Sequence, residues 1–230
     1  MTATDWENPV VRSGMERMLA QRSAVLESGG RAIGWKLGFG APAWLEKFDL
    51  SGPLLGFLPE SRSHPPGATV SCRGWLRPVA EPEIAVYIGR DVEDPSRAAE
   101  AVSGLGAAIE LADVDPPPDD LETTLAVNIF HRAVILGEPD PELSTLDVGM
   151  LRARVHVDGS QVADTTELET LTGDLSDILG HAAALLASAG ERLRAGEVVI
   201  AGSVIAPIEI SPGSEVSYEL SPLDPVTVRV

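Results

Sequence analysis

The chain has 230 residues, of which 44% are hydrophobic, and its formal net charge is −18 at pH 7. This hydrophobic fraction is typical of a globular protein with a buried core and argues against a disordered chain. The negative charge argues against nucleic acid and against an anionic membrane surface, because both would repel it. A metal cation would be attracted, and an anionic substrate would need a local positive centre.

The expected cellular location rests on three sequence features. Cys72 is the one cysteine, so no intramolecular disulfide can form and no oxidising compartment is indicated. The stretch from Met1 to Glu7 has neither the basic nor the apolar region of a signal peptide. The most apolar helix candidate, residues 177–189, is too short to cross a membrane and contains His181. We therefore expect a cytoplasmic protein that does not contact a membrane.

The first part of the chain predicts a small cap of mixed structure. The expected elements are a helix over 11–28, a strand over 32–40, a short helix over 41–48 and a long loop over 50–68. The loop is expected because this stretch is rich in Gly, Pro and Ser. We expect residues 1–69 to form a cap segment that packs on a larger β-rich domain, residues 70–230.

The pattern from residue 70 onward is one of short strands separated by turns. Predicted strands cover 83–89, 106–111, 132–136, 152–157, 160–164, 197–201, 205–210, 214–220 and 225–230. One long helix, from about Leu175 to Arg194, interrupts them and has an apolar face that is expected to pack on the sheet. Because strands outnumber helices here, this part predicts a β-rich roll or sandwich.

Two turn signals sharpen this outline. Asp158-Gly159 lies between two alternating runs and predicts a tight hairpin. Pro116-Pro117-Pro118 breaks the chain, after which Asp119 or Asp120 is expected to cap a short helix.

Three glutamates at strand positions are the first candidates for chemistry. Glu81 and Glu83 are two residues apart at the start of an apolar strand, so both side chains point to one side. Glu110 ends another apolar run. Three carboxylates at strand ends suit a hard divalent cation such as Mg²⁺ or Mn²⁺. The same spacing also fits the wet face of an edge strand with Glu110 unrelated, and the pair alone does not decide between the two.

Stretches spread over residues 12–230 resemble a known superfamily in kind and in order. They are Gly34-Trp35-Lys36-Leu37-Gly38, Glu81-Pro82-Glu83, Ile109-Glu110, Leu179-Gly180-His181, the run from Leu193 to Ser203, and Ser211-Pro212-Gly213-Ser214-Glu215-Val216. Together they resemble the fumarylacetoacetate hydrolase superfamily. The nearer likeness is to its branch of 2-keto-4-pentenoate hydratases and 4-oxalocrotonate decarboxylases.

The resemblance implies a fold and a metal site. The fold is α+β, a mixed β-sandwich roll with a small N-terminal helical and β cap and one long packed helix. The implied metal is Mg²⁺ or Mn²⁺, held by Glu81, Glu83 and Glu110. A 2-keto acid substrate would chelate it through its carboxylate and keto oxygens, and the metal would stabilise an enolate.

The resemblance also implies roles for four residues around the substrate and for one histidine. Lys36 would lie near the substrate carboxylate or the developing oxyanion. Lys36, Leu37, Asn128 and Ser203 would contact the substrate, although Asn128 could instead brace a loop and Ser203 could be an ordinary turn residue. His131 could act as acid or base near neutral pH or be structural. Lys36, Ser203 and His131 are thus the catalytic candidates.

The chain also departs from the branch at several positions. In its A-D-N-A-[SG] motif the acid is replaced by Val127 and the small residues by Ile129 and Phe130. The acid of its D-F-G stretch is missing from Pro53-Leu54-Leu55-Gly56-Phe57, and Ala182 replaces the proline after L-G-H. The substrate side is therefore changed towards apolar contact, which favours a bulkier or more hydrophobic substrate, or a changed reaction.

The functional prediction is a metal-dependent lyase that acts on a 2-keto or 2-hydroxydienoic acid, as 2-keto-4-pentenoate hydratases do. The alternatives are a 4-oxalocrotonate-type decarboxylase, a C–C bond hydrolase or keto–enol isomerase on the same scaffold, and a catalytically weak ligand-binding or accessory subunit. Glu110 stands where the cleaving branch usually has an aspartate, which favours the hydratases and decarboxylases. The resemblance also implies a homo-oligomer.

Overall fold

The computed structural model describes residues 5–115 and 119–230. Two features of the sequence analysis lie outside the described residues. They are the prolines at 116–118 and the first four residues of the stretch that was compared with a signal peptide. Two β-sheets and four α-helices make up most of the described chain, which confirms the α+β class.

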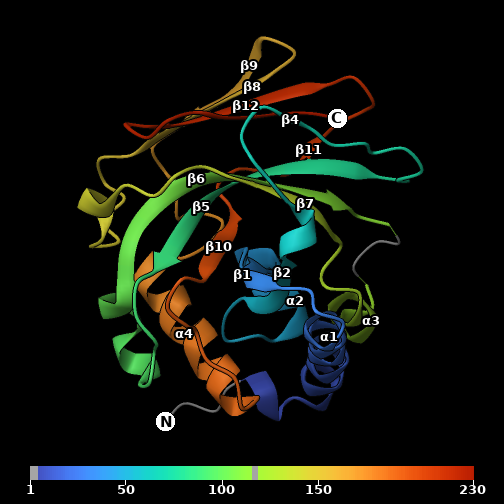
Figure 1. Cartoon of the computed structure of the whole chain (residues 1–230), viewed down its shortest axis with the longest axis vertical. Helices are drawn as coiled ribbons and strands as arrows, with labels where there is room; N and C mark the ends of the chain where they lie inside the picture. The colour runs from blue at the N-terminus through green and yellow to red at the C-terminus, as the bar shows by residue number, and fades with distance from the viewer. Residues whose placement is uncertain (1–4, 116–118) are drawn as a thin grey trace.

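The larger sheet has eight strands in the order β2-β1-β10-β5-β6-β7-β3, and β11 pairs with β5. Its strands are β1 (Ala32–Gly38), β2 (Leu54–Pro59), β3 (Ser63–His64), β5 (Pro78–Ile88), β6 (Val102–Asp113), β7 (His131–Leu136), β10 (Val198–Ser203) and β11 (Ile208–Glu209). β5 and β6 are its longest strands, and they arch over β1, β2 and β10 (Figure 1).

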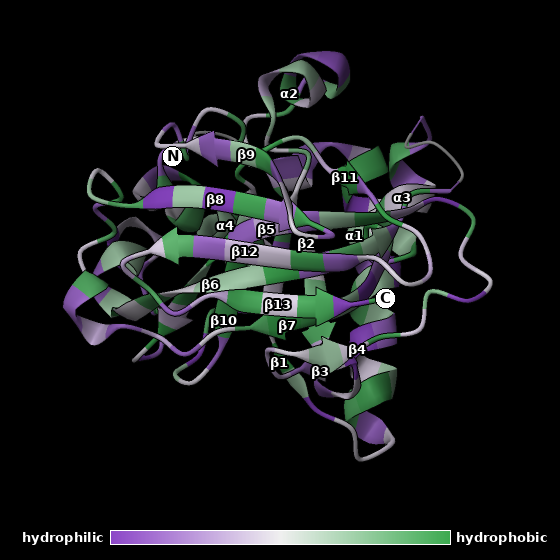
Figure 2. Cartoon of the chain, turned by 90° about the horizontal axis from the view of Figure 1, so that it is seen from above, coloured by the Kyte–Doolittle hydropathy of each residue, from purple (hydrophilic) through white to green (hydrophobic). Residues whose placement is uncertain are grey.

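The smaller sheet has five strands in the order β4-β13-β12-β8-β9. They are β4 (Ala68–Thr69), β8 (Arg152–Val157), β9 (Ser160–Thr165), β12 (Glu215–Ser221) and β13 (Val226–Arg229). β12 and β13 pack against β6. Buried and partly exposed residues alternate along β12, and Figure 2 shows this sheet from above with its mixed hydropathy. One face of the small sheet therefore covers the large sheet while the other faces solvent.

Helices pack on the side of the large sheet remote from the small one (Figure 1). They are α1 (Pro9–Glu27), α2 (Pro42–Phe48), α3 (Leu121–Ala126) and α4 (Leu175–Ser188), with 3₁₀ turns η1 (Asp5–Glu7), η2 (Glu60–Arg62), η3 (Pro95–Ala101) and η4 (Pro141–Leu143). α1 packs along α3 and β2, and α4 packs on η3 and β10. No helix among the described residues is long and apolar enough to cross a membrane.

Local sequence signals explain several of these boundaries. The hairpin between β8 and β9 turns through Asp158 and Gly159, whose φ angles of 51° and 78° confirm the predicted tight turn. Asp120 caps α3 by accepting a hydrogen bond from the Thr123 amide at 3.1 Å. α4 ends at Ser188 and not at Arg194, because the chain turns at Gly190, where φ is 78°.

One sequence prediction in the first part of the chain is wrong. Residues 50–68 are not a long loop, since they contain β2, which is buried along its whole length and pairs with β1. The short apolar run of β2 has the composition of a strand buried on both faces, and the surrounding Gly, Pro and Ser residues mask it. β1 itself pairs with β10, so both strands extend the large sheet. The division at residue 69 stays a prediction.

Candidate active site

The register of β5 and β6 brings the three glutamates together. Glu81 lies directly opposite Glu110 across the antiparallel pair, and Glu83 follows two residues later on the same side of β5. On its other edge β5 pairs with β10, where Ser203 lies opposite Glu83. One carboxylate oxygen from each glutamate lies within 4.8 Å of the other two. The prediction that these side chains cluster is therefore confirmed.

Each of the two buried glutamates keeps one oxygen free. Glu83 and Glu110 are 0% exposed. Oε2 of Glu83 accepts a hydrogen bond from the Gly202 amide at 2.7 Å, and Oε1 of Glu110 accepts from Lys36 Nζ at 2.6 Å. The other oxygens, Oε1 of Glu83 and Oε2 of Glu110, are buried without a hydrogen-bond partner. Buried unpaired carboxylate oxygens that converge with a third acid are what a hard divalent cation binds, so these residues fit such an ion.

The electrostatics of the cluster point the same way. Burial first, and the nearby Glu110 charge second, raise the pKa of Glu81 to about 7. The same two causes raise the pKa of Glu83 well above its ordinary value. Burial would also raise the pKa of Glu110, but the Lys36 ammonium and the bond from His131 outweigh it and lower that pKa. Three carboxylates so placed repel one another, and a bound cation relieves that repulsion.

Lys36 is the one cation in contact with this cluster among the described residues. Its side chain is 2% exposed, and Nζ donates to Glu110 Oε1 and, at 3.0 Å, to the carbonyl of Ile129. Burial alone would lower the pKa of Lys36, but the carboxylates of Glu110, Glu81 and Glu83 outweigh it and raise the pKa. Lys36 therefore stays an ammonium and contributes a fixed positive charge.

Gly56 makes room for this lysine. It lies on β2, opposite Lys36 in the antiparallel pair with β1. A Cβ atom at Gly56 would lie 2.7 Å from Asn128 Oδ1 and 2.9 Å from Lys36 Cγ. Any other residue at position 56 would displace one of these two side chains.

The remaining site candidates, His131, Asn128 and Ser203, differ in their burial and in their hydrogen-bond partners. His131, at the start of β7, is 1% exposed, and its Nδ1 is 2.8 Å from Glu110 Oε1. Because burial lowers the pKa of His131, the ring is neutral near pH 7, and Nδ1–H donates to the carboxylate. Asn128 is bonded at both ends to the Phe57 backbone, at 2.7 and 2.8 Å, and so braces β2. Ser203 lines the cavity and donates to the Pro82 carbonyl at 3.3 Å.

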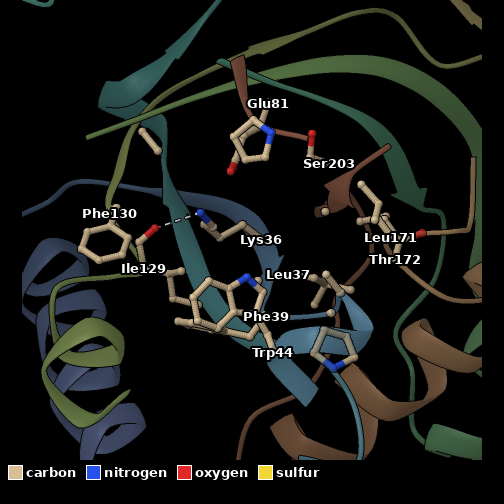
Figure 3. A pocket seen from close by; sticks show the side chains of 18 of the residues that line it. Lys36, Leu37, Phe39, Trp44, Glu81, Ile129, Phe130, Leu171, Thr172 and Ser203 are labelled. Carbon is tan, nitrogen blue, oxygen red and sulfur yellow. Dashed lines mark hydrogen bonds between the residues drawn. The ribbon is translucent and has the colours of Figure 1, made fainter. Parts of the chain in front are cut away.

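A cavity of about 200 Å³ opens beside the carboxylates (Figure 3). Glu81, Ser203 and Lys36 lie at one end, which we name the carboxylate end. Phe39 and Trp44 lie at the other, which we name the aromatic end. Ile129, Phe130, Leu171, Thr172 and Ile205 line the walls between them. Leu37 also lines the cavity, whereas Asn128 and His131 do not.

The sequence did not reveal the aromatic end or the wall residues beyond position 130. The one signal was the departure from the family motif at Ile129 and Phe130. Together with Asn128 these residues have φ angles of 62°, 47° and 62°, a left-handed run that is rare for non-glycine residues. This backbone turns the Ile129 carbonyl to Lys36 while both hydrophobic side chains line the cavity.

Tyr218 of β12 is a further buried group that the sequence did not single out. Its side chain is 0% exposed, and its hydroxyl has no hydrogen-bond partner. Burial, and then the Glu83 charge, raise its pKa. The smaller sheet thus places a polar group near Glu83 from the side opposite the helices.

Comparisons with known proteins agree with this arrangement. The family model described as fumarylacetoacetate (FAA) hydrolase C-terminal matches residues 42–230. A 4-oxalocrotonate decarboxylase from a Pseudomonas species is 28% identical over 206 residues, which are 86% of this chain and 78% of the relative. A 2-hydroxyhexa-2,4-dienoate hydratase from Comamonas testosteroni is 27% identical over 199 residues, 83% of this chain and 74% of the relative.

A solved structure extends the likeness to the fold. The 4-oxalocrotonate decarboxylase from Pseudomonas putida G7, complexed with magnesium and adipate, aligns with a TM-score of 0.85. The alignment covers 99% of this chain and 90% of that one at 21% sequence identity. The predicted mixed β-roll is therefore confirmed.

Proposed function

Because the chain belongs to the fumarylacetoacetate hydrolase family, we propose that it is a divalent-metal-dependent lyase acting on a 2-keto or 2-hydroxydienoic acid. The observation that carries the proposal is the pair of unpaired, buried oxygens on Glu83 and Glu110, converging with Glu81 beside a cavity. The names of the sequence relatives, hydratase and decarboxylase, support the same class of reaction.

Glu81, Glu83 and Glu110 would hold Mg²⁺ or Mn²⁺. All three are oxygen donors, which both ions prefer, and the chain offers no His or Cys ligand within this cluster of described residues. When bound, the ion supplies a Lewis acid for the keto group of the substrate.

Lys36 would provide the second positive charge. Lys36 lines the cavity, and its ammonium is held by hydrogen bonds to Glu110 Oε1 and to the Ile129 carbonyl. A fixed cation in a site closed to water stabilises negative charge that develops on the substrate oxygens. Against the effect of burial, the carboxylates of Glu110, Glu81 and Glu83 raise the pKa of Lys36 in the metal-free site, which favours a role through its charge.

The other candidates would act through contact or through position. The Ser203 hydroxyl donates to the Pro82 carbonyl, so its lone pairs remain available to a water or a substrate hydroxyl. Leu37 would contact the substrate from the cavity wall. His131 lies outside the cavity lining and would act as a positioning residue, orienting Glu110 through Nδ1. Asn128 would contribute by fixing the loop that carries Ile129.

Two reactions suit this arrangement. In a hydration, 2-hydroxypenta-2,4-dienoate and water give 4-hydroxy-2-oxopentanoate. The enol O–H proton leaves as a proton joins C5, hydroxide then joins C4, and a further proton joins C3, so that the sum is the addition of one water. In a decarboxylation, a 2-oxohex-3-enedioate loses its remote carboxylate as CO₂, and the electron pair moves towards the keto oxygen before a proton replaces the lost group. Both reactions place negative charge on the oxygen near Lys36.

The test follows the ultraviolet absorbance of 2-hydroxypenta-2,4-dienoate after protein is added with Mg²⁺, with Mn²⁺ or with EDTA. We expect the absorbance to fall with either metal and to persist with EDTA. A parallel assay measures CO₂ release from 2-oxohex-3-enedioate. Metal uptake without turnover of either compound would contradict the lyase proposal and favour a binding or accessory role.

Two further predictions, a location in the cytoplasm and assembly into a homo-oligomer, stay predictions. Sedimentation equilibrium of the purified chain measures the second.

A further inference from the structure

We infer that the substrate carries an uncharged, apolar group at the end remote from its 2-keto acid, and that Phe39 and Trp44 bind this group. The inference rests on the proposed function, because it takes the keto acid to lie at the carboxylate end. It goes further by naming the chemical class of the substrate tail.

The charges of the cavity lie at one end only. Lys36 and Glu81 are the charged residues among the described residues that line it, and both lie at the carboxylate end (Figure 3). The walls and the aromatic end are formed by apolar side chains, chiefly Phe39, Trp44, Ile129, Phe130, Leu171 and Ile205. Thr172 is the polar exception, and its hydroxyl is engaged by the carbonyls of Leu168 and Gly173 at 3.4 and 3.1 Å.

The aromatic end is a preformed surface, because its aromatic rings pack against one another and against Phe48. Phe39 meets Trp44 edge-on with ring centroids 5.7 Å apart, and it meets Phe48 in the same way at 5.7 Å. Trp44 and Phe48 are stacked at 5.8 Å. Rings fixed in this way lose little conformational entropy when a flat apolar group packs on them.

The cation that contacts the Trp44 ring does not line the cavity. Lys47 Nζ lies 4.9 Å from the centroid of the Trp44 ring and is paired with Asp119 at 2.7 Å. Lys47 is not among the residues that line the cavity. A second carboxylate on the substrate would therefore meet apolar rings and no compensating positive charge among the described lining residues of the aromatic end. This arrangement disfavours 2-keto dicarboxylic acids and favours monocarboxylic acids with an apolar tail.

The kinetic test compares four 2-hydroxydienoates that carry hydrogen, methyl, phenyl or carboxylate at the remote carbon. We expect kcat/KM to rise from hydrogen to methyl to phenyl, with about a 100-fold span, and to be lowest for the dicarboxylate. The dicarboxylate tests the opposite possibility. An apolar wall can destabilise a bound carboxylate and so speed its loss as CO₂, which would raise kcat/KM for this compound. A higher kcat/KM for the dicarboxylate than for the phenyl compound would overturn the inference.

Two substitutions and a control locate the preference. Trp44→Ala is expected to reduce the phenyl-to-hydrogen ratio of kcat/KM by about tenfold or more. Trp44→Arg places a cation at the aromatic end and is expected to raise the relative kcat/KM of the dicarboxylate. Lys47→Met, which changes a neighbouring cation outside the cavity, is expected to leave the preference unchanged. A preference that is lost in Lys47→Met and kept in both Trp44 variants would overturn the inference.

Binding measurements separate this inference from the proposed function. Calorimetry in Mg²⁺ compares pyruvate, phenylpyruvate and 2-oxoglutarate, which share the 2-keto acid and differ in the tail. Tightest binding of phenylpyruvate without turnover of any dienoate would support the apolar tail and contradict the lyase proposal. Turnover of the dienoates with no preference among tails would leave the lyase proposal intact and overturn the inference.

Discussion

The two ends of the cavity are built from different parts of the fold. The glutamates lie on the paired strands β5 and β6, and their separations follow from strand register. Lys36 lies on β1, which β10 separates from β5 in the same sheet. Phe39 follows β1, and Trp44 lies on the short helix α2. Positions fixed by register cannot shift without breaking the sheet, whereas loops and short helices tolerate exchange. We therefore infer that the strands of the large sheet determine the class of reaction. The loop after β1 and the helix α2 determine which substrate tail is bound.

The largest expected effect tests the carboxylate end. Glu83→Gln keeps the shape of the side chain but removes one of the negative charges that would hold the ion. We expect Mg²⁺ or Mn²⁺ affinity to fall by about 1,000-fold or more, with little loss of folding stability, because the lost charge is also a buried one. Calorimetric metal titration and urea unfolding measure the two quantities. Glu209→Gln, on an exposed strand, is the matched control, and equal metal affinity in both variants would remove Glu83 from the site.

Lys36→Met tests the positive charge at the same end. We expect turnover to fall by about 100- to 1,000-fold, because a fixed cation near the reacting oxygen is lost. Without metal, the free energy of unfolding should also fall, by about 3–5 kcal/mol, since Glu110 loses its buried partner. Steady-state rates and unfolding with and without Mg²⁺ check both expectations. Lys47→Met provides the comparison, and wild-type rates in Lys36→Met would show that Lys36 is incidental.

His131 tests whether a residue outside the cavity acts through Glu110. His131→Phe removes the Nδ1 donor, and we expect metal affinity to fall by about 10- to 100-fold. His131→Gln can still offer an N–H to the carboxylate and should recover part of that loss. A metal titration of both variants decides the matter. Equal affinity in wild type and His131→Phe would leave the histidine a purely structural role.

The carboxylate end is also expected to show a pH dependence. Burial and the Glu110 charge raise the pKa of Glu81 from 4.5 to about 7, so protons compete with metal below that pH. Metal affinity should rise about tenfold per pH unit for each proton released, and the contribution of Glu81 should flatten above about pH 7. In metal-free protein the folded state binds this proton more tightly than the unfolded state. Stability should therefore fall as the pH rises from about 4.5 to 7.

Titrations at pH 5, 6, 7 and 8 measure the affinity, and urea unfolding without metal measures the stability. The aromatic end has no titratable group among its described lining residues, so the affinity for apolar tails should not follow the same profile. A metal affinity that is flat between pH 5 and 7 would contradict the raised pKa.

The sequence was informative where chemistry and local pattern coincide. The three glutamates and Lys36 stand in stretches that resemble the family in kind and in order, and the structure brings them together. β2 was missed because proline, serine and glycine around it outweigh a short apolar run. The aromatic end could not be predicted, since only tertiary packing places Phe39 and Trp44 in one cavity with Glu81. The roles of His131 and Asn128 were ambiguous because their partners, Glu110 and the Phe57 backbone, lie far along the chain.

The left-handed run at Asn128, Ile129 and Phe130 has an evolutionary consequence. Its peptide backbone holds Lys36 in place, while its side chains shape the cavity. New side chains at positions 129 and 130 can therefore alter which compounds are accepted without disturbing the carbonyl that anchors the lysine. The range of exchanges is limited to residues that tolerate positive φ. Mutations at two neighbouring codons, 129 and 130, can thus change the substrate preference of this enzyme. The residues that would carry out the reaction stay unchanged.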